Sequence, residues 1–137
     1  MNGRIEALMS QYGNKGFFSR IAPTKEALAE AREKLGFPIP KQFLEYLNMY
    51  SYGGIGFEIL GIGLDGHIAF LDETLEYREE GLPDNLLVVE NCDEWLYCID
   101  VESGEVVSWA PGEEPQAAYS SFDDYLEDRL DGAIENL

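Results

Sequence analysis

The chain has 137 residues, 45% of them hydrophobic and 12% aromatic, which predicts one folded domain over residues 1–137 and excludes a fibrous or disordered chain. Its formal net charge is −18, from 27 acidic and 9 basic residues. Because such a charge repels phosphate backbones and anionic lipid, we expect no nucleic acid and no membrane surface among the partners.

The second part of the chain carries this charge. Residues 1–64 hold seven basic and six acidic residues, a sum of +1, whereas residues 65–137 hold two basic and twenty-one acidic residues, a sum of −19. An acidic surface attracts a basic partner and speeds its association. The same charge also keeps a protein soluble, so it favours a basic partner without requiring one.

Three helices are predicted in the first fifty residues. A short amphipathic segment runs from Arg4 to Tyr12. In the stretch IAPTKEALAEAREKLGF, Ala and Leu recur at helical spacing, Thr24 marks the start and Gly36 the end. The stretch PIPKQFLEYLNMY follows, and Pro40 suits its first turn. The apolar stripe of this third helix, which is expected to pack on a core, contains Phe43, Leu44, Leu47 and Tyr50.

After residue 56 the hydrophobic period changes to that of strands. FEIL and HIAFL are predicted to pair through a turn at Asp65 and Gly66, and DETLEYREE to form a short helix. LLVVE, WLYCID and EVVSW are predicted as three further strands, whose hairpin-length connections favour antiparallel pairing. APGEEPQAA is predicted as a loop, and SSFDDYLEDRLDGAIENL as a final helix with Ser121 and Asp124 in capping-box spacing.

This order of elements is typical of an α+β fold. We expect an antiparallel sheet of about five to six strands, with the N-terminal helices and the C-terminal helix packed on it. No internal repeat or linker divides the chain, so the charge step at residue 64 is expected to separate two faces or layers of one domain.

A glycine-rich stretch, NMYSYGGIGFEILGIGLDG, covers residues 48–66. It includes a partial G-x-G-x-x-G pattern, but a dinucleotide-binding motif needs a strand before it and a helix after it, and here the predicted order is reversed. No Lys or Arg occurs between Lys41 and Arg78 to neutralise a phosphate. We therefore expect no nucleotide and no other cofactor, and we predict that Gly53 and Gly54 end the third helix.

Side chains suited to catalysis or metal binding are few or poorly spaced. His67 is the only histidine, and it lies in a predicted strand without a nucleophile motif nearby. The tightest acidic clusters lack the spacing of a metal-binding loop or of a recognisable glycosidase pair, and solvated turns explain them. These clusters contain Asp93, Glu94, Asp100, Glu102 and Glu105. The sequence therefore predicts neither an enzyme nor a metal site.

Cys92 and Cys98 are not in C-x-x-C spacing, which argues against a disulfide framework or a zinc site and favours two reduced thiols. The first residues lack the features of a signal peptide, and no segment approaches the length of a membrane span. A cytoplasmic location is expected, with the protein as a monomer or weak dimer.

Aromatic residues on the strand WLYCID are the best candidates for contact with a partner. Alternation places Trp95 and Tyr97 on one face and Leu96 and Cys98 on the other. If the second pair faces the core, Trp95 lies outward beside acidic residues; in the reverse case Trp95 is a core residue. The residues expected to bind a partner, chosen for charge density beside aromatic rings, are Tyr52, Phe57, Glu73, Glu76, Glu79, Glu80, Asp93, Glu94 and Trp95.

The ordered set of elements resembles the SUKH superfamily, which unites fungal cell-wall regulators of the Smi and Knr type with bacterial relatives. The resemblance begins at EALAEAREKLGFPIPKQFLEYLNMYSYGG, where Leu-Gly and a proline separate two helices. It continues through FEILGIG, LLVVENCDEWLYCID, EVVSWAPGE and SSFDDYLEDRL, and covers most of residues 22–130.

This resemblance implies an α+β fold and a non-enzymatic role. Bacterial relatives are implicated as immunity proteins that bind and block a cognate polymorphic toxin, often a nuclease, so the expected partner is a cationic toxin domain. Two alternatives stay open. One is a regulatory or scaffold module like the fungal branch, and the other is a small hydrolase that uses Asp93 or Asp100.

Overall fold

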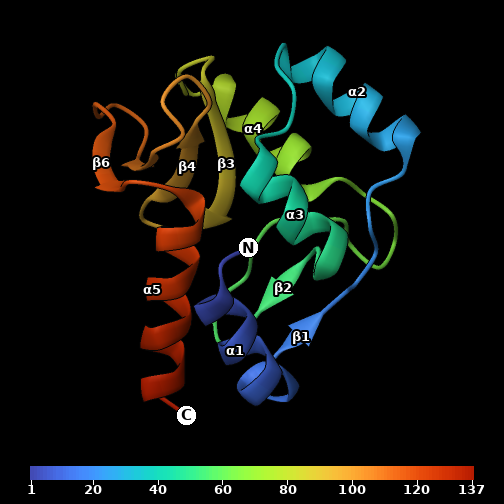
Figure 1. Cartoon of the computed structure of the whole chain (residues 1–137). Helices are drawn as coiled ribbons and strands as arrows, with labels where there is room; N and C mark the ends of the chain where they lie inside the picture. Colours follow the sequence, from blue (N-terminus) through green and yellow to red (C-terminus); the bar gives the residue numbers. More distant parts are fainter.

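The computed structural model describes residues 1–137 as helices and short antiparallel strands arranged in layers (Figure 1). The helices are α1 (Gly3–Tyr12), α2 (Lys25–Leu35), α3 (Lys41–Met49), α4 (Ala69–Arg78) and α5 (Phe122–Glu135), and a 3₁₀ turn, η1 (Gly13–Lys15), follows α1. The strands are β1 (Phe17–Phe18), β2 (Gly53–Gly54), β3 (Leu86–Asn91), β4 (Leu96–Asp100), β5 (Val106–Trp109) and β6 (Gln116–Tyr119).

The strands form two separate antiparallel sheets. β3, β4, β5 and β6 pair in chain order as a four-stranded meander, whereas β1 and β2 form a two-stranded ribbon. The α+β fold with antiparallel strands and a packed C-terminal helix is confirmed. The six strands do not share one sheet, because β1 and β2 come from segments more than thirty residues apart that meet below the main sheet in Figure 1.

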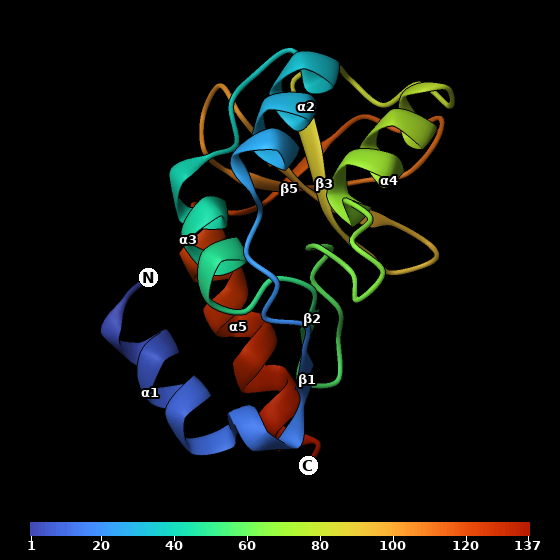
Figure 2. The ribbon, with the colours of Figure 1, turned by 90° about the vertical axis from the view of Figure 1, so that its right-hand side faces the viewer.

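Helices cover both faces of the main sheet. On one face Thr74 of α4 accepts a hydrogen bond from the backbone N–H of Val88 at 3.0 Å, and α2 lies beside α4 (Figure 2). On the other face Tyr125 and Arg129 of α5 contact Glu90 of β3. A residue that points away from one helix layer therefore meets the other layer, and alternation alone does not place it in solvent.

An aromatic cluster joins three helices at the centre of the core. Phe43 of α3 contacts Phe70 of α4 and Phe122 of α5, each with ring centroids 5.4 Å apart and edge-to-face geometry. All three rings are almost completely buried. Edge-to-face pairs of this kind add about 0.5–1.5 kcal/mol each beyond the burial of apolar surface.

The predicted ends of α2 and the predicted start of α5 are confirmed, but the prediction that Gly53 and Gly54 end the third helix was wrong. α3 ends at Met49, and the two glycines form β2, where their small size allows close pairing with β1. The side chain of Thr24 accepts a hydrogen bond from the N–H of Ala27 at 3.0 Å, and Gly36 ends α2 with a φ of 89°, in the left-handed region. Ser121 accepts from the N–H of Asp124 at 3.1 Å at the start of α5. Pro40 immediately precedes the first residue of α3 as its N-cap.

Three further local predictions were wrong. FEIL does not form a strand: within it only Ile59 makes an isolated bridge, to Gly53, and the rest of the segment is irregular. The apolar run HIAFL does not form a strand: Ile68 makes a single bridge to Ile62, and α4 begins at Ala69. A run this short fits the strand and helix periods equally well, and burial of Phe70 and Leu71 together with Thr74 favours the helix. The loop predicted after β5 contains β6, an exposed edge strand whose sequence lacks the alternation of a half-buried strand.

Candidate functional site

A groove of about 430 Å³ opens at the start of α4, between the segment after β2 and the end of β3. We call it the acidic groove, and it is lined by Tyr52, Glu58, Leu60, His67, Ala69, Asp72, Glu73, Asn91 and Asp93. Four of these side chains are carboxylic acids and none is Lys or Arg. Figure 2 shows the three contributing segments on one side of the molecule, with the hairpin between β3 and β4 beside the turn that precedes α4.

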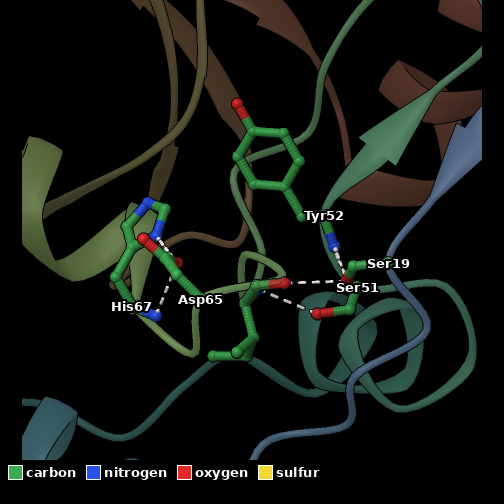
Figure 3. A network of polar contacts seen from close by, with 6 residues as sticks. Ser19, Ser51, Tyr52, Asp65 and His67 are labelled. Atoms are coloured by element: carbon green, nitrogen blue, oxygen red, sulfur yellow. Dashed lines mark hydrogen bonds and ion pairs between the residues drawn. The ribbon is translucent and has the colours of Figure 1, made fainter.

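Two serines hold the backbone behind the acidic groove. Ser51 accepts a hydrogen bond from the N–H of Ile62 at 2.8 Å, and Ser19 donates to the carbonyl of Ile62 at 2.7 Å (Figure 3). Ser19 also accepts from the N–H of Tyr52 at 3.2 Å. The same contacts explain Gly61, because a Cβ there would lie 2.3 Å from the backbone of Ser51 and Tyr52.

Tyr52 forms one wall of the groove and donates a hydrogen bond to Oε2 of Glu58 at 2.7 Å. Its ring lies 6.5 Å from the ring of His67, tilted by 55°. Partial burial, followed by the hydrogen bond to Glu58, raises the pKa of the Tyr52 hydroxyl to about 12. At neutral pH this hydroxyl is therefore neutral and stays a donor to the carboxylate.

His67 lies in the turn before α4 and points toward Asp65 (Figure 3). Nδ1 of His67 contacts Oδ1 of Asp65, which also accepts from the N–H of His67 at 3.1 Å. The hydrogen bonds from His67 lower the pKa of the Asp65 carboxyl. The prediction that His67 lies in a strand was wrong, but its ordinary hydrogen-bonding role is what the geometry shows.

The far wall of the groove joins α4 to the hairpin between β3 and β4. Asn91 donates to Oε1 of Glu73 at 2.8 Å, and its own side-chain oxygen accepts from the N–H of Asp93 at 2.8 Å. Asp93 has a φ of 67°, which aspartate tolerates better than most residues. These contacts hold the Asp93 carboxylate at the rim of the groove.

Neither basic residue of the acidic part of the chain neutralises the groove. Nη2 of Arg78 donates to the carbonyl of Leu35 at 2.8 Å, at the end of α2. Arg129 binds Glu90 and lies over the ring of Phe57, 5.0 Å from its centroid. Since both guanidinium groups are engaged elsewhere, the carboxylates of the groove face solvent without a basic side chain among them.

The lining of the groove is mainly acidic and aromatic. Its lining includes no serine, threonine or cysteine that could act as a nucleophile beside His67. No group of three or more His, Cys, Asp or Glu side chains in the chain has the arrangement that a metal ion needs. Cys92 and Cys98 are free thiols in the structure. What the groove offers chemically is negative charge beside two aromatic rings.

Comparison with known proteins identifies the family. The SUKH family model described as SMI1-KNR4 cell-wall matches residues 4–131. The chain belongs to this SMI1-KNR4 family.

A solved structure with a similar fold is also found for this SMI1-KNR4 chain. The crystal structure of a protein from Pseudomonas syringae pv. tomato matches with a TM-score of 0.66, over 92% of this chain and 98% of that one. At 22% sequence identity the likeness concerns the fold alone. None of the helices in the SMI1-KNR4 fold is both long enough and apolar enough to cross a bilayer.

Within this fold the predicted partner-binding residues separate into groups. Tyr52, Glu73 and Asp93 line the acidic groove. Glu76 is exposed on α4, and Glu79 and Glu80 are exposed in the turn that follows it. Glu94 and Trp95 are exposed at the end of the hairpin. Phe57 offers little surface, because it is only 8% exposed and the guanidinium of Arg129 lies over its ring.

The open question about the WLYCID strand is settled by burial. Leu96 and Cys98 are buried, and Trp95 is 39% exposed. Tyr97 shares the face of Trp95 but packs on Tyr125 of α5, with ring centroids 5.2 Å apart. Trp95 is therefore a surface residue, whereas Tyr97 belongs to the layer between the sheet and α5.

Sequence reasoning did not place six of the nine lining residues at a partner site: the apolar Leu60 and Ala69 and the polar Glu58, His67, Asp72 and Asn91. Asp72 directly precedes Glu73, so the acidic pair at the start of a predicted helix was a usable signal. No sequence pattern indicates Glu58 or Asn91, because the two residues are far apart in the chain and only the fold brings them together.

Proposed function

We propose that this SMI1-KNR4 protein is a non-enzymatic immunity protein that binds a basic toxin domain and blocks it, with a nuclease as the expected class of toxin. The observation that carries the proposal is the acidic groove, in which four carboxylates gather without a lining Lys or Arg. The groove suits a cationic protein surface, and the family is the context in which such a partner is a toxin.

Charge explains how such binding inhibits a nuclease. A nuclease holds its substrate through basic side chains that contact phosphates. Carboxylates of the groove can pair with those basic side chains in place of the phosphates and so exclude the nucleic acid. The −19 sum over residues 65–137 also steers a basic partner toward this side, and steered association reaches about 10⁸–10⁹ M⁻¹s⁻¹ at low salt. Fast capture in the cytoplasm protects the cell before the toxin acts.

The test is co-expression with the toxin domain encoded beside this gene, scored by growth, followed by stopped-flow binding to a catalytically inactive form of that domain. Asp72→Asn together with Asp93→Asn removes two groove charges, and asparagine keeps the positive φ at position 93 acceptable. Glu113→Gln together with Glu114→Gln is the matched control, since it removes two exposed charges that lie outside the groove and are not among the residues expected to bind a partner. The groove variant should associate about tenfold more slowly, and the control much less so.

Two results would contradict the proposal. Toxicity that persists when the wild-type protein is co-expressed would remove the immunity role. Equal association rates for the groove and control variants would leave the role in place and remove the groove from it.

The family description favours a second candidate, a regulatory or scaffold module, because the matching family is named for cell-wall proteins. Such a module would bind a cell-wall or signalling protein in place of a toxin. Affinity capture from the native cell separates the two candidates, with the Asp72→Asn and Asp93→Asn variant as the negative control. The protein that the wild type captures and the variant does not is then identified as a toxin or as a cell-wall or signalling protein.

A further inference from the structure

Phe17 is an exposed aromatic ring next to the acidic groove. Its side chain is 54% exposed, more than that of Trp95, the other exposed aromatic residue. It lines a second hollow of about 400 Å³, together with Lys15, Gly16, Gly53, Gly54, Gly56, Phe57 and Glu58. We call this hollow the glycine hollow. Glu58 lines both the glycine hollow and the acidic groove, so the two adjoin at this residue.

The two-stranded ribbon explains why the ring of Phe17 is exposed to solvent. Phe18 turns inward and contacts Tyr50, with centroids 5.3 Å apart, so alternation turns Phe17 outward. The residue directly opposite Phe17 is Gly54, which has no side chain to cover the ring. The ribbon is also too tight for a larger residue, because a Cβ at Gly53 would lie 2.0 Å from the carbonyl oxygen of Phe17.

The glycine hollow adjoins the acidic groove near Tyr52 and Glu58. Tyr52 lines the groove and lies two residues before Gly54, the residue that pairs with Phe17 in the ribbon. Tyr52 in turn donates to Glu58, the residue common to both hollows. One surface thus runs from the ring of Phe17 to the carboxylate of Glu58 and on to the other three acids of the groove.

We infer that Phe17 is the apolar anchor of the partner interface, and that the partner is a basic protein whose loop places an apolar side chain in the glycine hollow and a Lys or Arg in the acidic groove. This inference rests on the proposed function and extends it to the glycine hollow, whose apolar ring could not be found from charge alone. Charge complementarity selects the occupant, because the residues that line the two hollows include four carboxylic acids and only one Lys or Arg, Lys15. Aromatic residues, Phe included, are enriched in the cores of protein interfaces, and a few such side chains carry most of the binding energy.

The decisive experiment measures the Kd of Phe17→Ala for the inactive toxin domain by calorimetry. Met49→Ala is the matched control, since Met49 is 47% exposed but lines neither hollow. Phe17→Ala should weaken binding about tenfold or more, as hot-spot truncations do, and Met49→Ala should leave Kd unchanged. Thermal melts of both variants should match the wild type, because each removed side chain is about half in solvent.

A gain-of-affinity variant tests the same surface without removing a side chain from the fold. Lys15→Glu should tighten binding several-fold at low salt if a basic partner covers the glycine hollow, whereas Lys25→Glu on α2, at the other end of the molecule in Figure 1, should change little.

Three outcomes are distinguishable. Weaker binding of Phe17→Ala with tighter binding of Lys15→Glu supports the anchor. Unchanged Kd for both variants, with wild-type binding intact, overturns the anchor and leaves the proposed function standing. Absence of wild-type binding to the toxin domain overturns the proposed function and the anchor together.

Discussion

The guanidinium of Arg129 and the carboxylate of Glu90 form an ion pair between α5 and β3, with Nε 3.0 Å from Oε1 and Nη2 2.5 Å from Oε2. The Glu90 side chain is 4% exposed and also accepts from the hydroxyl of Tyr125 at 2.6 Å. Loss of the arginine would leave this carboxylate buried with one donor. Arg129→Ala should therefore lower the free energy of unfolding by about 3 kcal/mol.

Urea denaturation followed by circular dichroism measures this change. Arg4→Ala is its control, because Arg4 pairs with Glu127 and Asp131 while its own side chain is 55% exposed. Exposed pairs contribute less than about 1 kcal/mol. A loss for Arg129→Ala no larger than that for Arg4→Ala would show that the buried pair does not hold α5 to the sheet.

Gly61 and Gly132 should respond oppositely to alanine. A Cβ at Gly61 would lie 2.3 Å from the backbone of Ser51, whereas a Cβ at Gly132 in α5 has nothing within 4 Å. Gly61→Ala should destabilise the protein by about 1–3 kcal/mol through overpacking, and Gly132→Ala should stabilise it by about 0.5–1 kcal/mol through helix propensity. Thermal melts of the two variants check both signs, and a tolerated alanine at position 61 would refute the close approach.

The two cysteines should be inert in the folded protein. Burial raises the pKa of each thiol, Cys92 and Cys98, to about 12, so the nucleophilic thiolate is scarce near pH 8. Titration with Ellman's reagent at pH 8 should therefore give a slow reaction in buffer and two rapid equivalents in denaturant. Rapid reaction of either thiol before unfolding would contradict the burial of that residue.

Tyr52 should ionise late. Its folded pKa of about 12 lies above the ordinary value near 10, so folding favours the neutral form. The stability that this preference contributes is complete below pH 10 and is lost as the pH rises through 12. Absorbance at 295 nm measures tyrosinate, so the absorbance difference between the wild type and Tyr52→Phe reports the ionisation of Tyr52. This difference should rise near pH 12. A difference that rises near pH 10 would mean that the hydroxyl is freely solvated.

Local pattern predicted the helices and the main strands well. Thr24, Gly36 and Ser121 act within a few residues of themselves, so their effect on helix ends can be read from neighbours in the chain. The failures occurred where local signals are ambiguous, as at the start of α4, or absent, as in the exposed strand β6. Phe57 shows the same limit for the interface, because its burial under Arg129 depends on a helix seventy residues away.

The sequence by itself determined the α+β order of elements, the excess of acid after residue 64 and the membership that the family comparison confirmed. Composition and hydrophobic periodicity depend only on the residues and their order in the chain, so they can be read without knowledge of the fold. Only the tertiary structure decided which acids share a groove, that Phe17 stands bare beside them, and that Arg78 and Arg129 are engaged elsewhere. Those facts depend on contacts between segments far apart in the chain, which no local pattern encodes.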